Sequence, residues 1–205
     1  FNLVVSSLSL EAARKEASRC LLCDELCNIC TMVCPNLANF SYRIDPVRYN
    51  LQKAVAGENG AVNFVNDVEF RADQPFQILN IRNLCNECGN CTTFCPSSGR
   101  PFADKPGICL SVKTLNEEGT GFFLSKLPEN MILIYKEKES VRTLTMSGEN
   151  YIYETNQVRA RIRQKDFSLL EVKFLTPCVR EARFSFAAEM SIIMKGAMEV
   201  KLYDC

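Results

Sequence analysis

The run LCNECGNCTTFCP, residues 84–96, decides how the rest of the chain is interpreted. Its cysteines follow the spacing Cys-x2-Cys-x2-Cys-x3-Cys-Pro, which is typical of chains that bind 4Fe-4S clusters. The two-residue gaps allow Cys85, Cys88 and Cys91 to bind three corners of one cluster. Gly89 has no side chain, so backbone N–H groups can approach the cluster sulfur atoms there. The fourth cysteine, Cys95, is expected to point away from the other three.

A second group of cysteines lies upstream, and its end, CNICTMVCP at residues 27–35, repeats the end of the later run. In bacterial two-cluster ferredoxins the last cysteine of each run binds the other cluster. The sequence therefore predicts two 4Fe-4S clusters in a ferredoxin-like domain. The ligands of one are Cys34, Cys85, Cys88 and Cys91. The ligands of the other are Cys95 and three of Cys20, Cys23, Cys27 and Cys30.

The upstream group leaves its ligand set open. Counting back from Cys34, the expected first ligand falls on Asp24, and Cys23 lies one residue early. Either a one-residue bulge restores Cys23, or Cys20 and Cys23 form a leading pair. The two clusters need eight thiolates and these runs supply nine, so one cysteine is a spare that the spacing does not identify.

Three other interpretations of the cysteines compete with this one. Paired Cys-x2-Cys motifs also build structural zinc sites, and a zinc module for protein or nucleic-acid contacts is the main alternative. Zinc, however, gives no reason for a third cysteine in each run or for the two Cys-Pro endings. A disulfide framework is typical of short secreted chains, and no secretory signal is evident. The spacing Cys23-x3-Cys27-x2-Cys30 also matches that of radical-SAM enzymes. No repeating strand–helix pattern for the barrel of such an enzyme follows it in the sequence.

The composition of the chain excludes several classes of function. The 205 residues include 24 Lys+Arg and 24 Asp+Glu, so no net charge favours nucleic acid or an anionic membrane. No apolar run reaches the roughly 18–20 residues that cross a bilayer. The absence of histidine excludes His-ligated zinc, Rieske centres and Ser-His-Asp catalysis. Clustered cysteines fit a reducing cytoplasm, and no catalytic residues are expected in this chain. The opening FNLVV is interpreted as the continuation of a longer polypeptide.

Further motifs carry a resemblance to known families. The segment EASRCLLC, residues 16–23, resembles the iron–sulfur domain shared by the glutamate synthase small subunit and dihydropyrimidine dehydrogenase. A longer set resembles the C-terminal part of the selenate reductase iron–sulfur subunit family. It comprises RCL (19–21), CPN (34–36), FQIL (76–79), CNECGNC (85–91), FCP (94–96), GRPF (99–102) and DK (104–105). The likeness covers residues 9 to about 125 and favours Cys20 and Cys23 as ligands.

This resemblance implies an oxidoreductase in which a flavin domain of the same polypeptide binds FAD and NAD(P)H. It also implies a molybdenum hydroxylase or another redox protein as partner. No Gly-x-Gly-x-x-Gly loop occurs here, so FAD and NAD(P)H are expected to bind outside these 205 residues. Electron transfer is then the expected role of the chain.

The fold class expected is α+β, in three parts. Residues 1–19 would be a linker and a helix, Leu10 to Arg19, capped by Ser9. Residues 20–115 would be the ferredoxin-like domain, with antiparallel strands at 39–44 and 76–81. Residues 45–75 would be an insertion that decorates its surface, or alternatively carries an interface. Within it we expect a helical turn at 50–56, a turn at 57–60 and a hairpin arm at 62–70.

Residues 116–205 would be a small α+β unit. Strands are expected at 121–125, 131–135, 141–146, 151–154, 158–163 and 169–174, then a helix from Thr176-Pro177 to about Lys195 and a last strand at 200–203. Arg159, Arg161 and Arg163 share one strand face, which is expected to be a solvated face rather than a docking site for an acidic redox partner. A further hypothesis makes this unit an interface for assembly, with the clusters idle.

Two smaller expectations concern the surroundings of the clusters. An apolar sheath is expected from Ile29, Met32, Val33, Ile81, Leu84 and Phe94. The isolated cysteines, Cys109, Cys178 and Cys205, are expected to be ordinary thiols and not ligands.

Overall fold

A computed structural model of the chain describes residues 8–17, 27–58 and 60–203. The helices are α1 (Leu10–Ala17), α2 (Ile29–Met32), the 3-10 turn η1 (Arg82–Leu84), α3 (Asn90–Thr93), α4 (Pro101–Asp104), α5 (Val112–Glu118) and α6 (Ser185–Glu199). The strands are β1 (Asn39–Arg43), β2 (Val47–Ala56), β3 (Val62–Ala72), β4 (Phe76–Ile81), β5 (Gly107–Cys109), β6 (Thr120–Lys126), β7 (Met131–Glu137), β8 (Ser140–Ser147), β9 (Asn150–Thr155), β10 (Val158–Arg163), β11 (Leu169–Phe174) and β12 (Glu181–Ala182).

Most strands join one mixed sheet of nine strands in the order β1-β4-β5-β6-β7-β8-β9-β10-β11. The pairs β4–β5 and β5–β6 are parallel, and the others are antiparallel. The strands predicted at 39–44, 76–81 and along the meander are confirmed, with one or two residues' difference at their ends. β5 and β6 are neighbours in this sheet, although the expected boundary at residue 115 falls between them.

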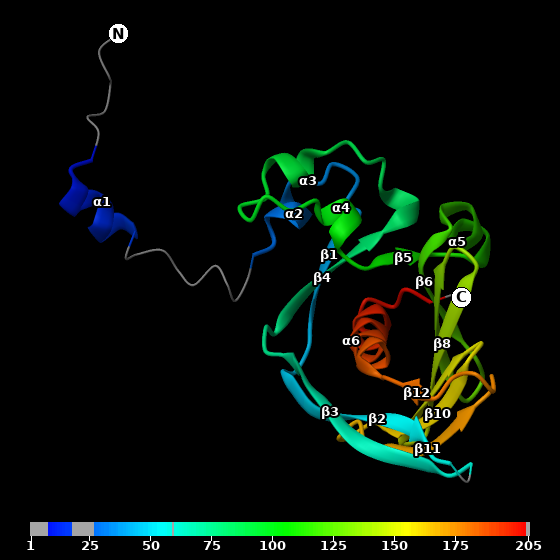
Figure 1. The fold of residues 1–205 in the computed structure, drawn as a ribbon. Helices are drawn as coiled ribbons and strands as arrows, with labels where there is room; N and C mark the ends of the chain where they lie inside the picture. The colour runs from blue at the N-terminus through cyan, green and yellow to red at the C-terminus, as the bar shows by residue number, and fades with distance from the viewer. Residues whose placement is uncertain (1–7, 18–26, 59, 204–205) are drawn as a thin grey trace.

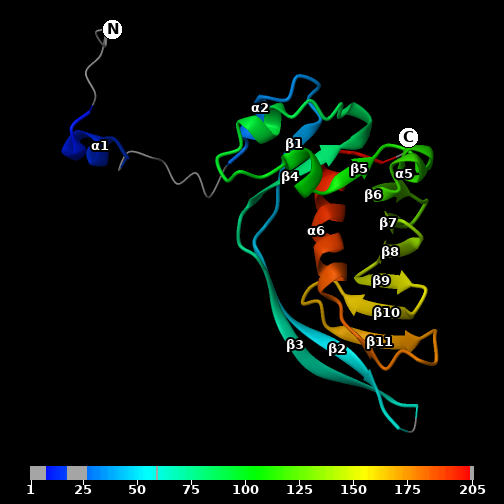
Figure 2. The ribbon, with the colours of Figure 1, turned by 45° about the horizontal axis from the view of Figure 1, so that its top comes forward.

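Helix α6 lies inside the curve of this sheet. Figures 1 and 2 show it enclosed by the meander on one side and by the long hairpin β2–β3 on the other. It contacts β1, β3, β6 and β8. Its fully buried residues Met190 and Met194 belong to one continuous core together with Leu133 and Leu144 of the sheet. The helix is therefore the centre of the core.

Hairpin β2–β3 completes the enclosure. The ring of Tyr49 on β2 stacks on Phe167, with 5.1 Å between ring centroids, and the backbone N–H of Leu169 donates to Gln52 Oε1 at 3.2 Å. The expectation of a helical turn at 50–56 is wrong, because these residues pair with β3 and, at Ala54 and Val55, with β12. Residues 45–75 are not a surface decoration, since Tyr49, Leu51 and Ala54 lie in the main core.

The C-terminal part differs from the expectation at both ends of its helix. The helix begins at Ser185, not at Thr176-Pro177, because Glu181 and Ala182 pair with the edge of β2 before it starts. Residues 200–203 do not form the expected strand. The helix ends in a turn, in which Lys201 has a φ of +57° and the Leu202 N–H donates to the Ala197 carbonyl at 2.8 Å.

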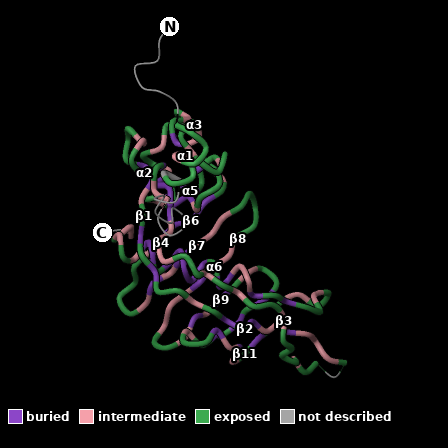
Figure 3. Tube along the Cα trace, turned by 90° about the vertical axis from the view of Figure 1, so that its left-hand side faces the viewer, coloured by how far each residue is buried: buried purple, intermediate pink, exposed green. Residues whose placement is uncertain are grey.

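The N-terminal helix begins at the predicted residue. Ser9 caps α1 as predicted, since its Oγ accepts from the Ala12 N–H at 3.2 Å; residues 18 and 19 lie outside the described part. Figure 3 shows that buried residues are sparse around α2 and α3 and frequent along the sheet and α6. Among the described helices, none is long and apolar enough to span a bilayer.

Candidate metal centre

The two cysteine runs fold into the same local structure. Each has a four-residue helix, α2 or α3, whose second residue is a cysteine. These two residues, Cys30 and Cys91, are only 8% and 7% exposed. They pack with Ile78 of β4 into a small cluster, flanked by Val33 and Phe102. The two runs therefore contact each other through equivalent buried thiols.

The Cys-Pro endings are also equivalent. The Ala38 N–H donates to Cys34 Sγ at 3.2 Å, and the Gly99 N–H donates to Cys95 Sγ at 3.3 Å. In both turns the residue before this donor has a left-handed backbone, with φ +52° at Leu37 and +55° at Ser98. Such a conformation is unfavourable for residues other than glycine. Each turn thus holds a backbone donor against a sulfur atom.

Four cysteines converge on one small cavity between the runs, here called the four-cysteine pocket. Its lining includes Cys34, Cys85, Cys88, Cys91, Gly89, Asn39 and Phe102. Cys34 comes from the upstream run and the other three thiols from the downstream run. Gly89 has a φ of +81°, so its backbone conformation explains the glycine there. The set equals the four ligands that the sequence predicts for one cluster.

The remaining cysteines of the runs line a second, wider cavity of about 420 Å³, the three-cysteine pocket. Its lining includes Cys27, Cys30, Cys95, Lys105 and Gln77. Here Cys95 of the downstream run joins two thiols of the upstream run. The other two predicted candidates, Cys20 and Cys23, lie outside the described residues. The last cysteine of each run therefore faces the pocket of the other run.

The donor set fits an iron–sulfur cluster better than a single metal ion. Within the described ranges no three Cys, Asp or Glu side chains lie close enough to hold one ion. A zinc site requires four sulfur atoms about 2.3 Å from the same point. In a 4Fe-4S cluster each thiolate binds a different iron, so the sulfur atoms are farther apart. The four-cysteine pocket has a volume of about 10 Å³.

Two thiols in the three-cysteine pocket have opposite electrostatic environments. Burial raises the pKa of Cys30, and the nearby Lys105 ammonium partly offsets this effect. The Ser97 side chain, whose Oγ lies 3.3 Å from Cys95 Sγ, holds the pKa of Cys95 below its ordinary value, and the Gly99 N–H acts in the same direction. Cys95 is therefore the thiol of this pocket that the surroundings favour most clearly as a thiolate.

The isolated cysteines lie outside both pockets. Cys109 is fully buried beside Leu115 and Phe123, and burial raises its pKa to about 11. Cys178 is exposed, and Cys205 lies outside the described residues. That these thiols are not ligands stays a prediction.

The apolar sheath around the pockets is only partly as expected. Ile81 is buried, but Met32 and Phe94 are 78% and 58% exposed, because α2 and α3 turn these side chains away from the cysteines. Ile78 and Phe102 line the pockets instead. Both lie in motifs that the sequence analysis noted, FQIL and GRPF, so their positions could have been suggested from the sequence.

A buried polar network behind the four-cysteine pocket was missed. Asn80 Nδ2 donates to Asn39 Oδ1 at 2.9 Å, and Asn39 Nδ2 donates to the Cys30 carbonyl at 3.0 Å. The Arg82 guanidinium donates to Asn80 Oδ1 at 3.4 Å and to the Phe102 carbonyl. The only signal in the sequence is an asparagine near the end of the apolar strand 76–81.

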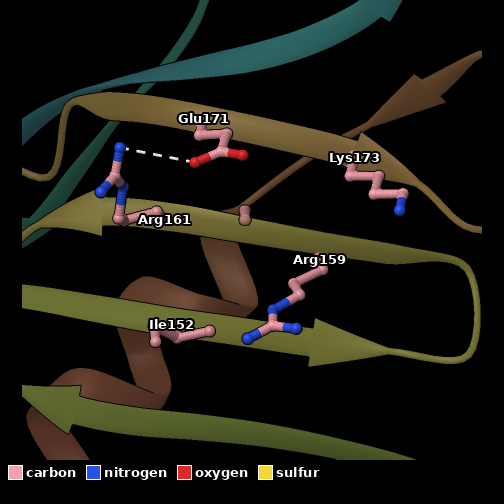
Figure 4. A pocket seen from close by; sticks show the side chains of 6 residues that line it. Ile152, Arg159, Arg161, Glu171 and Lys173 are labelled. Atoms are coloured by element: carbon pink, nitrogen blue, oxygen red, sulfur yellow. Dashed lines mark ion pairs between the residues drawn. The ribbon is translucent and has the colours of Figure 1, made fainter.

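The arginine-bearing strand face does not form a comparable site. Figure 4 shows Arg159 and Arg161 on β10 beside Glu171 and Lys173 on β11. Arg161 pairs with Glu171 at 3.4 Å, and Arg159 with Glu154 at 3.7 Å. These arginine charges are compensated by neighbouring carboxylates, so the face resembles an ordinary solvated strand surface.

Comparison with known proteins places part of the chain. A protein named "Putative oxidoreductase YgfK" from Escherichia coli strain K12 is 41% identical over 111 residues, and so is the protein of the same name from strain O157:H7. The alignment covers 54% of this chain but only 8% of each relative. No family model and no solved structure matches the chain. About half of the chain is thus similar to a small part of a protein named as an oxidoreductase.

Proposed function

We propose that this chain transfers electrons through two 4Fe-4S clusters held in a ferredoxin-like part of the fold. The observation that supports this most strongly is the exchange of cysteines. Cys34 lines the pocket of the downstream run, and Cys95 lines the pocket of the upstream run. Two-cluster ferredoxins use this exchange to bring their clusters close together. When bound, such a cluster accepts or releases one electron at a time.

The residues of the chain would have distinct tasks in this role. Cys34, Cys85, Cys88 and Cys91 would bind one cluster; Cys27, Cys30 and Cys95, with Cys20 or Cys23, would bind the other. The N–H groups of Ala38 and Gly99 would stabilise the thiolates of the two exchanged cysteines. Ile78, which packs with Cys30 and Cys91, would help to exclude water from the two pockets.

We further propose that the parent protein is a NAD(P)H- and flavin-linked oxidoreductase related to selenate reductase iron–sulfur subunits. A flavin domain in the same polypeptide would donate electrons, and a molybdenum hydroxylase or another redox protein would receive them. The similarity to a protein named as an oxidoreductase supports this placement. The role of the chain is then to divide a two-electron donor's output into single electrons.

Metal analysis and an optical spectrum of anaerobically purified protein test the proposal. We expect about eight irons per chain and a broad visible absorbance that bleaches with dithionite. Cys88→Ser should lower the iron content to about four per chain, whereas Cys109→Ser, a matched change outside both pockets, should leave it unchanged. A colourless protein with one or two zinc ions would refute the proposal and favour a structural module.

A further inference from the structure

We infer that Arg82 is a built-in positive charge that raises the reduction potential at the four-cysteine pocket. This inference rests on the proposed function. It concerns a residue that binds no cluster itself but acts through the groups that line the pocket. The charge of its guanidinium group is not balanced by a carboxylate among the described residues.

Arg82 is partly buried at the start of η1, between β4 and the downstream cysteine run. Its backbone carbonyl accepts the N–H of Cys85 at 3.1 Å. Its guanidinium donates to the carbonyl of Phe102 and to Asn80 Oδ1. Both acceptors are neutral, and no carboxylate of the described residues lies within 4 Å of the guanidinium. The positive charge therefore has no acidic partner in the described part of the chain.

An arginine remains charged in a protein, and partial burial of a charge without a counter-charge is costly. The nearby thiol of Cys109 does not compensate it, because burial keeps that thiol protonated at neutral pH. A cluster bound by four thiolates carries a net negative charge. The imbalance is removed when such an anion occupies the adjacent pocket.

The hydrogen-bond network connects Arg82 to that pocket. Its two acceptor residues lead directly to the lining: Phe102 lines the four-cysteine pocket, and Asn80 donates to Asn39, which also lines it. Asn80 and Asn39 are 0% and 4% exposed, so this connection is closed to bulk water. A charge that is hydrogen-bonded to this buried asparagine pair acts through a lower local dielectric than a charge in open solvent.

Gly107 on β5 leaves space for this guanidinium. A Cβ atom at residue 107 would lie 2.1 Å from Arg82 Nε and 2.6 Å from its Cζ. Any larger residue would displace the charged group. The position is buried within the sheet, where glycine otherwise weakens a strand. Space for Arg82 is a physical reason for the glycine.

The other pocket has a different cation. Lys105 lines the three-cysteine pocket directly and acts on Cys30 and Cys95. Its side chain belongs to an exposed residue, so its field is screened by salt. Arg82 is only partly exposed, so salt screens its charge less. The cations beside the two cysteine sets therefore differ in exposure and in salt dependence, and the exposed carboxylate of Glu87 also lines the four-cysteine pocket.

A fixed positive charge favours the state with more negative charge. On reduction one electron enters from a reduced flavin, or from dithionite in the laboratory, and no bond is formed or broken. The added negative charge is stabilised by Arg82, which makes reduction at this pocket easier. Removal of the charge should lower the equilibrium constant for reduction about tenfold, which is about 59 mV for one electron.

The test is a redox titration of the 205-residue chain, followed by electron paramagnetic resonance, with iron content measured in parallel. Cys88→Ser identifies the signal of the four-cysteine pocket as the one that is lost. We expect Arg82→Gln to lower the reduction potential of that signal by about 59 mV, which is a tenfold change in the equilibrium constant for reduction. Arg82→Lys should keep the potential near the wild-type value. Lys105→Gln should move the other signal, with an effect that shrinks at high salt.

Several outcomes would overturn the inference. Unchanged potentials in Arg82→Gln with full iron content would show that the charge has no effect. Equal shifts in Arg82→Gln and Arg82→Lys would show that shape, not charge, matters. If Arg82→Gln fails to retain iron, Gly107→Ala decides, because it displaces the guanidinium while keeping its charge; an unshifted potential there contradicts the inference. Absence of iron from the wild-type chain would instead refute the proposed function itself.

Discussion

The cysteine end of the molecule, residues 27–38 and 82–106, and the sheet body, formed by β2–β3, β6–β11 and α6, are stabilised in different ways. The body has a continuous core in which Leu133, Leu144 and Met194 are fully buried. The cysteine end has one small buried cluster, centred on Cys30, Cys91 and Ile78. Its helices α2, α3 and α4 have four residues each, too few to be stable without other contacts.

Under the proposed function, the difference predicts which part of the fold would depend on bound clusters. The body buries enough apolar surface to fold by the hydrophobic effect. The cysteine end lacks such a core and instead concentrates thiols, as small metal-stabilised domains do. We therefore expect metal–thiolate bonds to stabilise the cysteine end, while the body remains folded without them.

Removal of the metal should separate the two regions most strongly. Metal binding to structural sites contributes on the order of 10 kcal/mol to folding in small domains. After anaerobic chelation, the amides of residues 27–38 and 85–105 should exchange hydrogen at least about 100-fold faster, while those of β6–β11 and α6 keep their protection. Hydrogen exchange with mass spectrometry measures this directly. A uniform loss of protection would mean that the two regions fold as one unit.

A matched pair of Phe→Ala substitutions compares the contribution of the apolar core in the sheet body with that of an exposed side chain in the cysteine end. Phe184 is 1% exposed and packs edge-on against Tyr153, whereas Phe94 in the cysteine end is 58% exposed. Phe184→Ala should lower the free energy of unfolding by about 3–5 kcal/mol. Phe94→Ala should change it by less than about 1 kcal/mol. Urea denaturation followed by circular dichroism measures both, and similar losses would contradict the assignment of the core to the body.

Alkaline pH should weaken the body through Tyr151. Burial, and then the proximity of Tyr49, raises the pKa of Tyr151 to about 12, while an unfolded tyrosine has a pKa of about 10. The native state therefore keeps the Tyr151 hydroxyl proton to a higher pH than the unfolded state does. The contribution of this group to the free energy of unfolding is fully present below about pH 10 and is lost as the pH rises to about 12. The loss is roughly 2–3 kcal/mol.

The substitution Tyr151→Phe isolates that contribution. The Tyr151 hydroxyl is buried and has no hydrogen-bond partner among the described residues. Its removal should raise the stability at pH 7 by up to about 1 kcal/mol and reduce the loss between pH 10 and 12. Denaturation curves at both pH values measure the effect. Destabilisation at pH 7 would indicate that the hydroxyl has a partner in solution.

Both regions were partly predictable from the sequence, each for its own reason. In the body, β10 alternates buried Val158, Ala160 and Ile162 with exposed arginines, and this period of two identifies a strand. In the cysteine end, the spacing predicts one complete set, and the four-cysteine pocket collects its members Cys34, Cys85, Cys88 and Cys91. The other pocket collects Cys27, Cys30 and Cys95, from a set that the spacing leaves open. Short patterns in the sequence were therefore sufficient to predict this strand and one complete ligand set.

The errors lie where distant segments meet. The alternation of β2 is interrupted by a register shift between Asn50 and Gln52, which hides the strand in the sequence. The helix predicted to begin at Thr176-Pro177 starts later because β2 takes up residues 181 and 182 as an edge pair. The network from Arg82 to Asn39 joins residues of both runs and could not be found from either run alone.

One such distant contact, between Gly196 of α6 and Tyr42 of β1, links the body to the strand that leads out of the upstream cysteine run. A Cβ atom at residue 196 would lie 2.2 Å from Tyr42 Cε2. Ala normally stabilises a helix relative to Gly by about 0.5–1 kcal/mol. Here Gly196→Ala should lower the free energy of unfolding by about 1–2 kcal/mol, because the buried ring must move.

The Gly196→Ala effect should depend on the ring of Tyr42. The double variant with Tyr42→Leu should show a smaller additional loss on adding the alanine than the wild-type background does. Hydrogen exchange of β1 should also increase in the single variant. A stabilised Gly196→Ala protein with unchanged β1 exchange would mean that α6 and β1 are not in close contact in solution.

The smallest effect is expected at the outer face of the body. The side chains of Arg161 and Glu171 are 52% and 69% exposed and form an ion pair at 3.4 Å. Such pairs contribute between zero and about 1 kcal/mol, because water and salt screen them. Arg161→Gln should therefore shift the free energy of unfolding by less than about 1 kcal/mol and leave the iron content and both reduction potentials unchanged. A salt-dependent fall in electron transfer to a redox partner in this variant alone would instead identify the face as a docking site. Arg161 and Arg82 would then both serve electron transfer, the first at the surface and the second beside a cluster.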